Sequence, residues 1–201
     1  MDVALFARHK LLVEQHFEEE KKSPAHDFSH VERTLRNADL ILKKEHADKE
    51  VVYYALLFSD YIREARHENE KGAPELSAVA AEAMLNGNLE KEKLQQILYC
   101  IKTHSRSSTE RPGTLEAKVV WDADKLDGVG KIGIARWFMQ AQEFGWSIES
   151  AAQKYITMVK GQIKKDQTFY TKTGRKYGEP KMYEALIICE DILKACKIKK
   201  A

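Results

Sequence analysis

Histidine and aspartate concentrate in four short segments of this sequence, and both residue types can bind divalent metal ions. The segments are residues 25–33, 57–60, 101–105 and 119–127. Imidazole nitrogens and carboxylate oxygens together form the mixed ligand shell that suits several divalent metals. A metal site assembled from separate segments is therefore the first hypothesis.

Asp60 follows closely on residues 51–58, which are apolar on every side and predict a helix at the centre of a helical bundle. A carboxylate beside such a core is costly unless a cation or several hydrogen bonds compensate it. One interpretation is a salt bridge to Arg33, Arg63 or Arg66. The other is a metal ion, with histidine and aspartate from other helices completing its ligands.

His26 and His30 are four residues apart, but Pro24 and a helix cap at Ser29 place His26 in the preceding loop. A single histidine is more often a capping or core residue than a metal ligand. The pair therefore indicates a metal site only in combination with the other segments.

Asp122, Asp124 and Asp127 lie within six residues, and three carboxylates so close together repel one another. At least one of them should face a cation. A helix cap at Asp122 and a solvated position for Asp127 leave Asp124 as the candidate ligand.

Taken together, the segments resemble one branch of the HD phosphohydrolase superfamily. The order and the separations agree over about residues 5–195. The matching stretches are His26-Asp27-Phe28-Ser29-His30, Ser59-Asp60, His104-Ser105, the Asp-Ala-Asp-Lys-Leu-Asp run at 122–127, and Gly133-Ile134-Ala135-Arg136.

The resemblance implies a divalent metal, such as Mn, Mg, Co, Ni or Fe, held by His30, Asp60 and Asp124. Asp124 is preferred to Asp122 because it stands in the Ala-Asp-Lys-Leu context that the superfamily shares. The implied reaction is hydrolysis of phosphate esters or anhydrides, often in nucleotides. The metal would polarise a phosphoryl oxygen and supply hydroxide at neutral pH.

Further roles follow from the same resemblance. Asp60 would also take part in catalysis, Glu64 would orient the attacking water, and His104 would face the substrate phosphate or a second metal. The residues that would contact the substrate or balance its charge are His26, Arg33, Lys125 and Arg136.

The sequence departs from the family pattern at Ser59, where the His-Asp doublet should have histidine. Losing even a partner behind a metal ligand typically costs about 10–100-fold in affinity or activity. Water could fill the vacant position, or His67 could reach the site. Alternatively, the chain has lost hydrolysis and keeps the fold for binding or regulation.

Composition narrows the class of protein. The 201 residues fit one domain, 1–201, and 33 basic against 31 acidic residues leave no net field for nucleic acid or anionic membranes. No apolar stretch approaches the length of a membrane span. Three scattered cysteines are typical of a reducing compartment, so we expect a cytoplasmic protein.

Apolar periodicity predicts an all-α protein, a single helical bundle of the HD-domain type. We expect a capping box of Ser29 with Glu32, and a loop at 167–180 because of Gly174 and Gly178. The expected helices span 2–21, about 29–42, 49–64, 75–86, 89–104, 115–126, 129–144, 148–167 and 180–198.

Two other patterns predict less than they suggest. Residues 128–133 match a dinucleotide-binding glycine motif, but no strand precedes them, and the small residues favour close helix packing instead. Cys100 and His104 lack the second Cys/His pair of a structural zinc site.

Trp137 and Trp146 could support a homodimer.

The leading hypothesis is a metal-dependent phosphohydrolase that acts on a small phosphorylated metabolite, a nucleotide above all. The rival is an HD-fold protein that binds a phosphorylated ligand or a partner without turnover. A third interpretation is a helical scaffold without a site.

Overall fold

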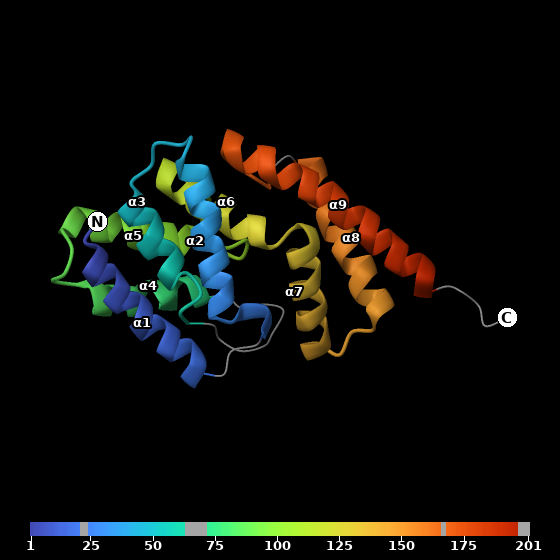
Figure 1. Cartoon of the computed structure of the whole chain (residues 1–201), viewed down its shortest axis with the longest axis horizontal. Coiled ribbons are helices and arrows are strands. Elements are labelled where there is room, and N and C mark those ends of the chain that lie inside the picture. Colours follow the sequence, from blue (N-terminus) through green and yellow to red (C-terminus); the bar gives the residue numbers. More distant parts are fainter. Residues whose placement is uncertain (21–23, 63–71, 166–167, 197–201) are drawn as a thin grey trace.

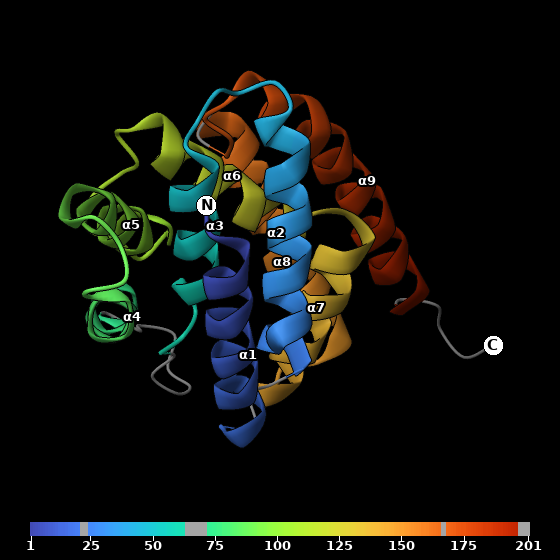
Figure 2. The same cartoon turned by 60° about the vertical axis from the view of Figure 1, so that its left-hand side comes forward.

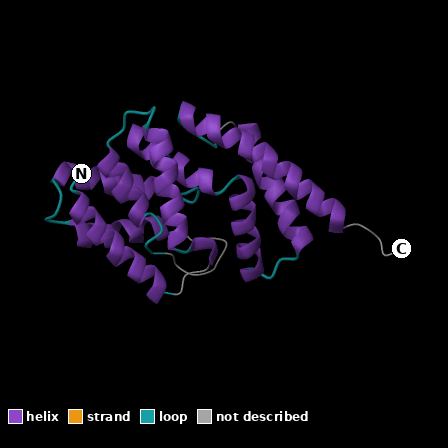
Figure 3. Ribbon diagram, in the orientation of Figure 1, coloured by secondary structure: helices purple, strands orange, loops and turns teal. Residues whose placement is uncertain are grey.

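The computed structural model describes residues 1–20, 24–62, 72–165 and 168–196. Every regular element within these ranges is helical and no strand occurs among them, which confirms the predicted all-α class (Figure 3). The elements are α1 Val3–Glu19, the 3-10 turn Pro24–His26, α2 Phe28–Leu42, α3 Lys49–Phe58, α4 Ala73–Leu85, α5 Lys91–Thr103, α6 Leu115–Asp127, α7 Gly130–Glu143, α8 Ile148–Lys165 and α9 Lys172–Cys196.

The helices form two groups with α6 between them (Figures 1 and 2). Helices α1 to α5 make up one group, and α7, α8 and α9 pack together as the other. Helix α6 contacts α2, α3 and α5 on one side and α7 and α9 on the other. Side chains on α6 can therefore meet residues from both groups.

Helix α3 lies at the centre of the first group, as its apolar run predicts. Tyr54, Leu56 and Phe58 are fully buried, and each such side chain contributes about 1.5–3 kcal/mol by leaving water. Asp48 caps the helix by accepting hydrogen bonds from the backbone N–H groups of Glu50 and Val51. The helix ends at Phe58, so Asp60 stands in the turn that follows.

The start of α2 differs from the prediction. Its N-cap is Asp27, and the hydroxyl of Ser29 donates to Asp27 Oδ1 at 2.5 Å instead of accepting from the helix. Glu32 pairs with Lys10 of α1, so no capping box forms. The 3-10 turn already reverses the chain before Asp27, which lets the helix begin one residue before Ser29.

The predicted loop at 167–180 was wrong, because α9 begins at Lys172 and contains Pro180. Its two glycines allow close packing. A Cβ atom on Gly174 would stand 2.2 Å from Asp122 Oδ2, and one on Gly178 would stand 2.1 Å from the Phe169 ring. Tertiary packing here outweighs a helix propensity that is about 1 kcal/mol poorer for glycine and about 3 kcal/mol poorer for proline than for alanine.

Residues 128–133 cover the two-residue junction after α6 and the first turn of α7. A helix, not a strand, precedes them, so the dinucleotide-binding interpretation fails on structural context. A Cβ atom on Gly133 would lie 2.2 Å from the carbonyl carbon of Gly128. Close packing, as expected, explains this glycine. Within the described ranges, none of the helices combines the length and the apolar character that crossing a bilayer requires.

Candidate functional site

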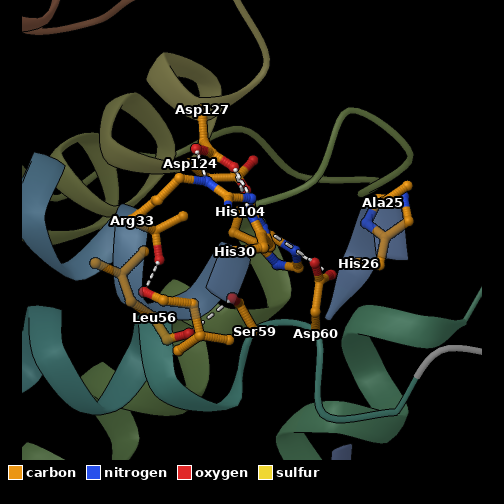
Figure 4. Close-up of polar contacts among 12 residues, drawn as sticks. Ala25, His26, His30, Arg33, Leu56, Ser59, Asp60, His104, Asp124 and Asp127 are labelled. Atoms are coloured by element: carbon orange, nitrogen blue, oxygen red, sulfur yellow. Dashed lines mark hydrogen bonds and ion pairs between the residues drawn. The ribbon is translucent and has the colours of Figure 1, made fainter. Parts of the chain in front are cut away.

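His30 of α2 stands at the centre of a buried cluster of charged side chains (Figure 4). It is 2% exposed, and its Nδ1 atom lies 2.7 Å from Asp127 Oδ2. Its Nε2 atom lies 3.2 Å from Asp124 Oδ1 and 3.3 Å from Asp60 Oδ2. The structure thus brings together the three residues expected to bind a metal, from α2, from α6 and from the turn after α3.

The electrostatic balance at His30 favours a protonated ring. Burial and the charge of Arg136 lower its pKa, but hydrogen bonds to Asp124, Asp127 and Asp60 outweigh them and raise the pKa to about 10. Burial raises the pKa of Asp124, while the charges of Lys125 and His30 bring it well below its usual range. A protonated His30 ring attracts Asp60, Asp124 and Asp127, and Lys125 adds positive charge beside Asp124.

Asp127 was expected to be solvated, and this expectation was wrong. The side chain is 3% exposed and accepts hydrogen bonds from Arg33 Nε at 2.6 Å and from Arg33 Nη2 at 3.1 Å. Arg136 Nη1 lies 2.9 Å from the same carboxylate. Positions 124 and 127 share one face of α6, and this helical spacing could have identified Asp127 from the sequence.

Three residues were expected to bind substrate. Arg33 and Arg136 contact Asp127, and His26 contacts Arg136. Arg136 Nε donates to the carbonyl oxygen of Ala25 at 2.7 Å, and its Nη2 donates to His26 Nδ1 at 3.1 Å. Arg33 Nη1 donates to Ser29 Oγ at 2.7 Å. Both arginines are thus engaged by protein groups in this arrangement, and they fix Asp127 behind His30.

His104 caps the C-terminus of α5 beside Asp60. Its Nδ1 donates to the carbonyl oxygen of Ile101 at 2.6 Å, because a carbonyl can only accept. In a neutral ring Nε2 therefore carries the lone pair, and this atom lies 3.7 Å from Asp60 Oδ1. Lys125, also expected to be catalytic, hydrogen bonds to Asp124 Oδ2.

Ser59 contributes no atom to the cluster. It is buried, and its hydroxyl donates to the carbonyl oxygen of Leu56 at 3.0 Å (Figure 4). A cavity of about 80 Å³ lies between Ser59, Asp60 and His104. Glu64 and His67, which were considered for this site, lie outside the described residues.

Asp122 points away from the cluster, because positions 122 and 124 lie on different faces of α6. It accepts hydrogen bonds from the backbone N–H groups of Tyr170 at 2.8 Å and Thr171 at 2.7 Å. Burial raises its pKa to about 6. Asp122 therefore anchors the segment before α9, and Asp124 is the aspartate placed beside His30.

The donor types at His30, Asp60 and Asp124 fit a divalent cation. Their separations of 3.2 and 3.3 Å resemble those of neighbouring ligands around a six-coordinate ion, about 3 Å apart. In the ranges that the structure describes, no three or more ligating side chains already enclose a point where an ion would sit. Binding a cation would require His30 to lose the proton on Nε2. The carboxylates of Asp60 and Asp124 would then turn from His30 Nε2 toward the cation.

No protein-family model matches the chain. YpgQ of Bacillus subtilis, described as uncharacterized, is 29% identical over 163 residues, covering 79% of this chain and 78% of YpgQ. The crystal structure of B. subtilis YpgQ in complex with ADP has a TM-score of 0.71 at 25% identity, covering 96% of this chain and 98% of that one.

Two further solved structures are named as hydrolases of the HD superfamily. A predicted HD superfamily hydrolase from an uncultured Thermotogales bacterium gives a TM-score of 0.64 at 25% identity, covering 94% of this chain and 92% of that one. An HD-superfamily hydrolase from Bacillus thuringiensis gives a TM-score of 0.70 at 21% identity, covering 99% of this chain and 100% of that one. At this level of identity the likeness is one of fold alone. The chain therefore has the all-α fold of HD-superfamily hydrolase structures, and it is similar to YpgQ in sequence as well.

Proposed function

We propose that this protein is a divalent-metal-dependent phosphohydrolase of the HD superfamily that acts on a small phosphorylated metabolite, a nucleotide. The observation that carries the proposal is His30, held between Asp60 and Asp124 with Asp127 behind it. A carboxylate on the far nitrogen is the usual means of orienting a metal-binding imidazole. The ADP bound in the YpgQ crystal structure supports the nucleotide class.

His30, Asp60 and Asp124 would hold the metal. When bound, the metal would polarise a phosphoryl oxygen and supply hydroxide at neutral pH. Asp127 keeps His30 in place through Nδ1, and Arg33 and Arg136 keep Asp127 ionised and oriented. These contacts fix the direction in which Nε2 points.

Lys125 and His104 would serve the reacting phosphate. The Lys125 ammonium lies against Asp124, where it adds positive charge for a phosphate oxygen. The lone pair on Nε2 of a neutral His104 lies beside Asp60, where it can accept a proton from water. Glu64 remains a prediction from the sequence.

The test is a panel of phosphate esters and nucleotides incubated with Mn²⁺, Co²⁺, Ni²⁺ or Mg²⁺. We expect hydrolysis of at least one nucleotide, with a loss of about 100-fold or more in Asp124→Ala and Asp124→Asn. Glu190→Gln, a change on the exposed face of α9, should retain full activity. Absence of hydrolysis across the panel with folded protein would overturn the proposal.

One observation favours a second candidate, a protein that binds a phosphorylated ligand without turnover. The Ser59 hydroxyl bonds to Leu56, so the position where the family has histidine offers no metal ligand. Thermal stabilisation by nucleotides, without release of phosphate under any metal, would favour this candidate. Turnover that disappears in Asp124→Ala would exclude it.

A further inference from the structure

A second cavity, of about 270 Å³, opens between α6 and α8, away from Ser59 and His104. Its lining combines aromatic, cationic and amide groups, from Arg106, Arg111, Trp121, Gly161, Gln162 and Tyr170. Ligand sites commonly range over about 300–1,000 Å³. A cavity just below that range suits one ring system better than a whole nucleotide.

The aromatic wall of this cavity is fixed in place. Trp121 Nε1 donates to the carbonyl oxygen of Thr168 at 3.0 Å, and the Tyr170 ring meets the indole edge-on at 5.5 Å between centroids. The backbone N–H of Tyr170 is in turn held by Asp122. The guanidinium of Arg111 lies 5.7 Å from the Trp121 ring centroid. Aromatic rings and guanidinium planes are the surfaces on which bases stack.

Gln162 supplies a polar group to the same cavity. Among the described residues its Oε1 atom is buried and has no hydrogen-bond partner. Buried acceptors are nearly always paired, so this oxygen calls for a donor. Rotation of the amide about its side-chain torsions would turn it toward a ligand in the cavity, and an exocyclic amino group on a base would donate to it.

Lys125 connects this cavity to the candidate metal site. Its ammonium lies 4.8 Å from the Trp121 ring centroid and also bonds to Asp124. Arg106 and Arg111, which line the cavity, add two further cationic side chains beside it. Cationic groups thus lead from the cavity to the cluster around His30.

We propose that this cavity binds the base of a nucleoside polyphosphate that carries an exocyclic amino group, with the phosphates passing Arg106 and Arg111 toward Lys125. The inference rests on the proposed function and names the substrate class of that site. The ring lies against the Trp121 and Tyr170 wall, and Gln162 accepts a hydrogen bond from the amino group.

The test compares ADP with purine riboside diphosphate, which differs only in lacking the amino group, and with inorganic pyrophosphate. Binding is measured by calorimetry on chelator-treated protein, so that hydrolysis plays no part. We expect ADP to bind at least tenfold more tightly than either comparison ligand. Gln162→Leu should bring ADP to within about twofold of purine riboside diphosphate, while Gln153→Leu, exposed on the same helix, should preserve the difference.

Arg111→Gln, on the exposed rim, should weaken ADP and purine riboside diphosphate by the same factor. Equal affinities for ADP and purine riboside diphosphate in the unmodified protein, or a preference that survives Gln162→Leu, would overturn the inference. Hydrolysis assays run in parallel with Mn²⁺ separate the two proposals. Hydrolysis at the same rate whatever the base would support the phosphohydrolase function and overturn the base site. Base-selective binding without hydrolysis would support the base site and overturn the phosphohydrolase function.

Discussion

Asp127 is the residue on which the cluster depends, because three positively charged or protonated groups converge on its carboxylate. Arg33, Arg136 and His30 all contact this carboxylate, which is 3% exposed. A buried ion pair gains from mutual attraction what it loses by desolvation, so removing one partner leaves the others uncompensated.

Asp127→Asn should therefore lower the free energy of unfolding by about 3–5 kcal/mol. It should also weaken metal binding by about 10–100-fold, since His30 loses the carboxylate behind it. Denaturant unfolding and calorimetric metal titration measure the two effects. Asp191→Asn, at an exposed pair on α9, should change stability by at most about 1 kcal/mol. Wild-type metal affinity in Asp127→Asn would show that Asp127 does not orient His30.

Ser59 occupies the position where the sequence resemblance implies a metal-binding histidine. Ser59→His would place an imidazole where the sequence resemblance implies one, next to a cavity of about 80 Å³. We expect the variant to bind Mn²⁺ at least about tenfold more tightly, as measured by titration and by elemental analysis of both proteins. Gln153→His, which adds an exposed histidine on α8, is the control. Unchanged affinity in Ser59→His would mean that position 59 lies out of reach of the ion.

Among the elements, α9 shows how packing overrides local signals. Gly178 approaches Phe169 so closely that no Cβ atom fits, whereas Gly161 of α8 has no heavy atom within 4 Å of the same position. Both glycines stand inside helices, where alanine is intrinsically better. The two positions therefore separate the packing effect from the propensity effect.

Gly178→Ala should destabilise the protein by about 1–3 kcal/mol through the clash with Phe169. Gly161→Ala should be neutral or stabilise it by up to about 1 kcal/mol. Thermal unfolding measures both, since about 1 kcal/mol shifts the melting temperature by roughly 2–4 °C in a chain of this size. Equal shifts in the two variants would contradict the packing explanation for α9.

The cap of α3 makes stability depend on pH. Burial raises the pKa of Asp48, but hydrogen bonds from Val51, Lys93 and Glu50 outweigh it and lower the pKa below its usual value. The folded state therefore favours the ionised form, so this stabilisation is present above the unfolded pKa of about 3.9 and is lost as the pH falls through the folded pKa.

Asp48→Ala should cost about 1 kcal/mol at pH 7. The difference from the unmodified protein should shrink when unfolding in urea is measured at pH 3. Asp191→Asn, far from the cap, should show no such pH-dependent difference. A constant difference at both pH values would mean that the charge of Asp48 adds nothing to its cap.

At the scale of the whole molecule, periodicity was enough to predict the all-α class and the burial of α3. Periodicity failed where contacts between distant segments determine the local structure. The glycines of 167–180 predicted a loop because the packing of Gly174 against Asp122 depends on α6, a distant helix that the local pattern does not contain. Asp127 was expected to be solvated because its partners Arg33 and Arg136 lie in other helices.

The candidate site follows the same logic. Residue types and order indicated His30, Asp60 and Asp124, and the structure places both carboxylates within 3.3 Å of His30 Nε2. The turn of Ser59 toward Leu56 depends on where α3 ends, and no motif encodes it. The cavity lined by Trp121 and Gln162 likewise exists only after α6 and α8 have packed.

Metal binding should stabilise the whole molecule, because the donors come from α2, α6 and the end of α3. Mn²⁺ at 100 times its dissociation constant should add about 2.7 kcal/mol to the free energy of unfolding, and a chelator should reverse the gain. Thermal scans with increasing Mn²⁺ measure this effect. Asp124→Asn should remove most of it, and a melting temperature insensitive to Mn²⁺ would contradict metal binding by the cluster.

The 97 residues that separate His30 from Asp127 also set an order of events during synthesis. At about 5–20 residues per second, the ribosome produces Asp127 roughly 5–20 s after His30. Throughout that interval the nascent chain carries Arg33 and His30 without the carboxylate that will pair with them. The contacts among α1, α2 and α3 need no residue made after α3, whereas the charged cluster cannot close until α6 has been made.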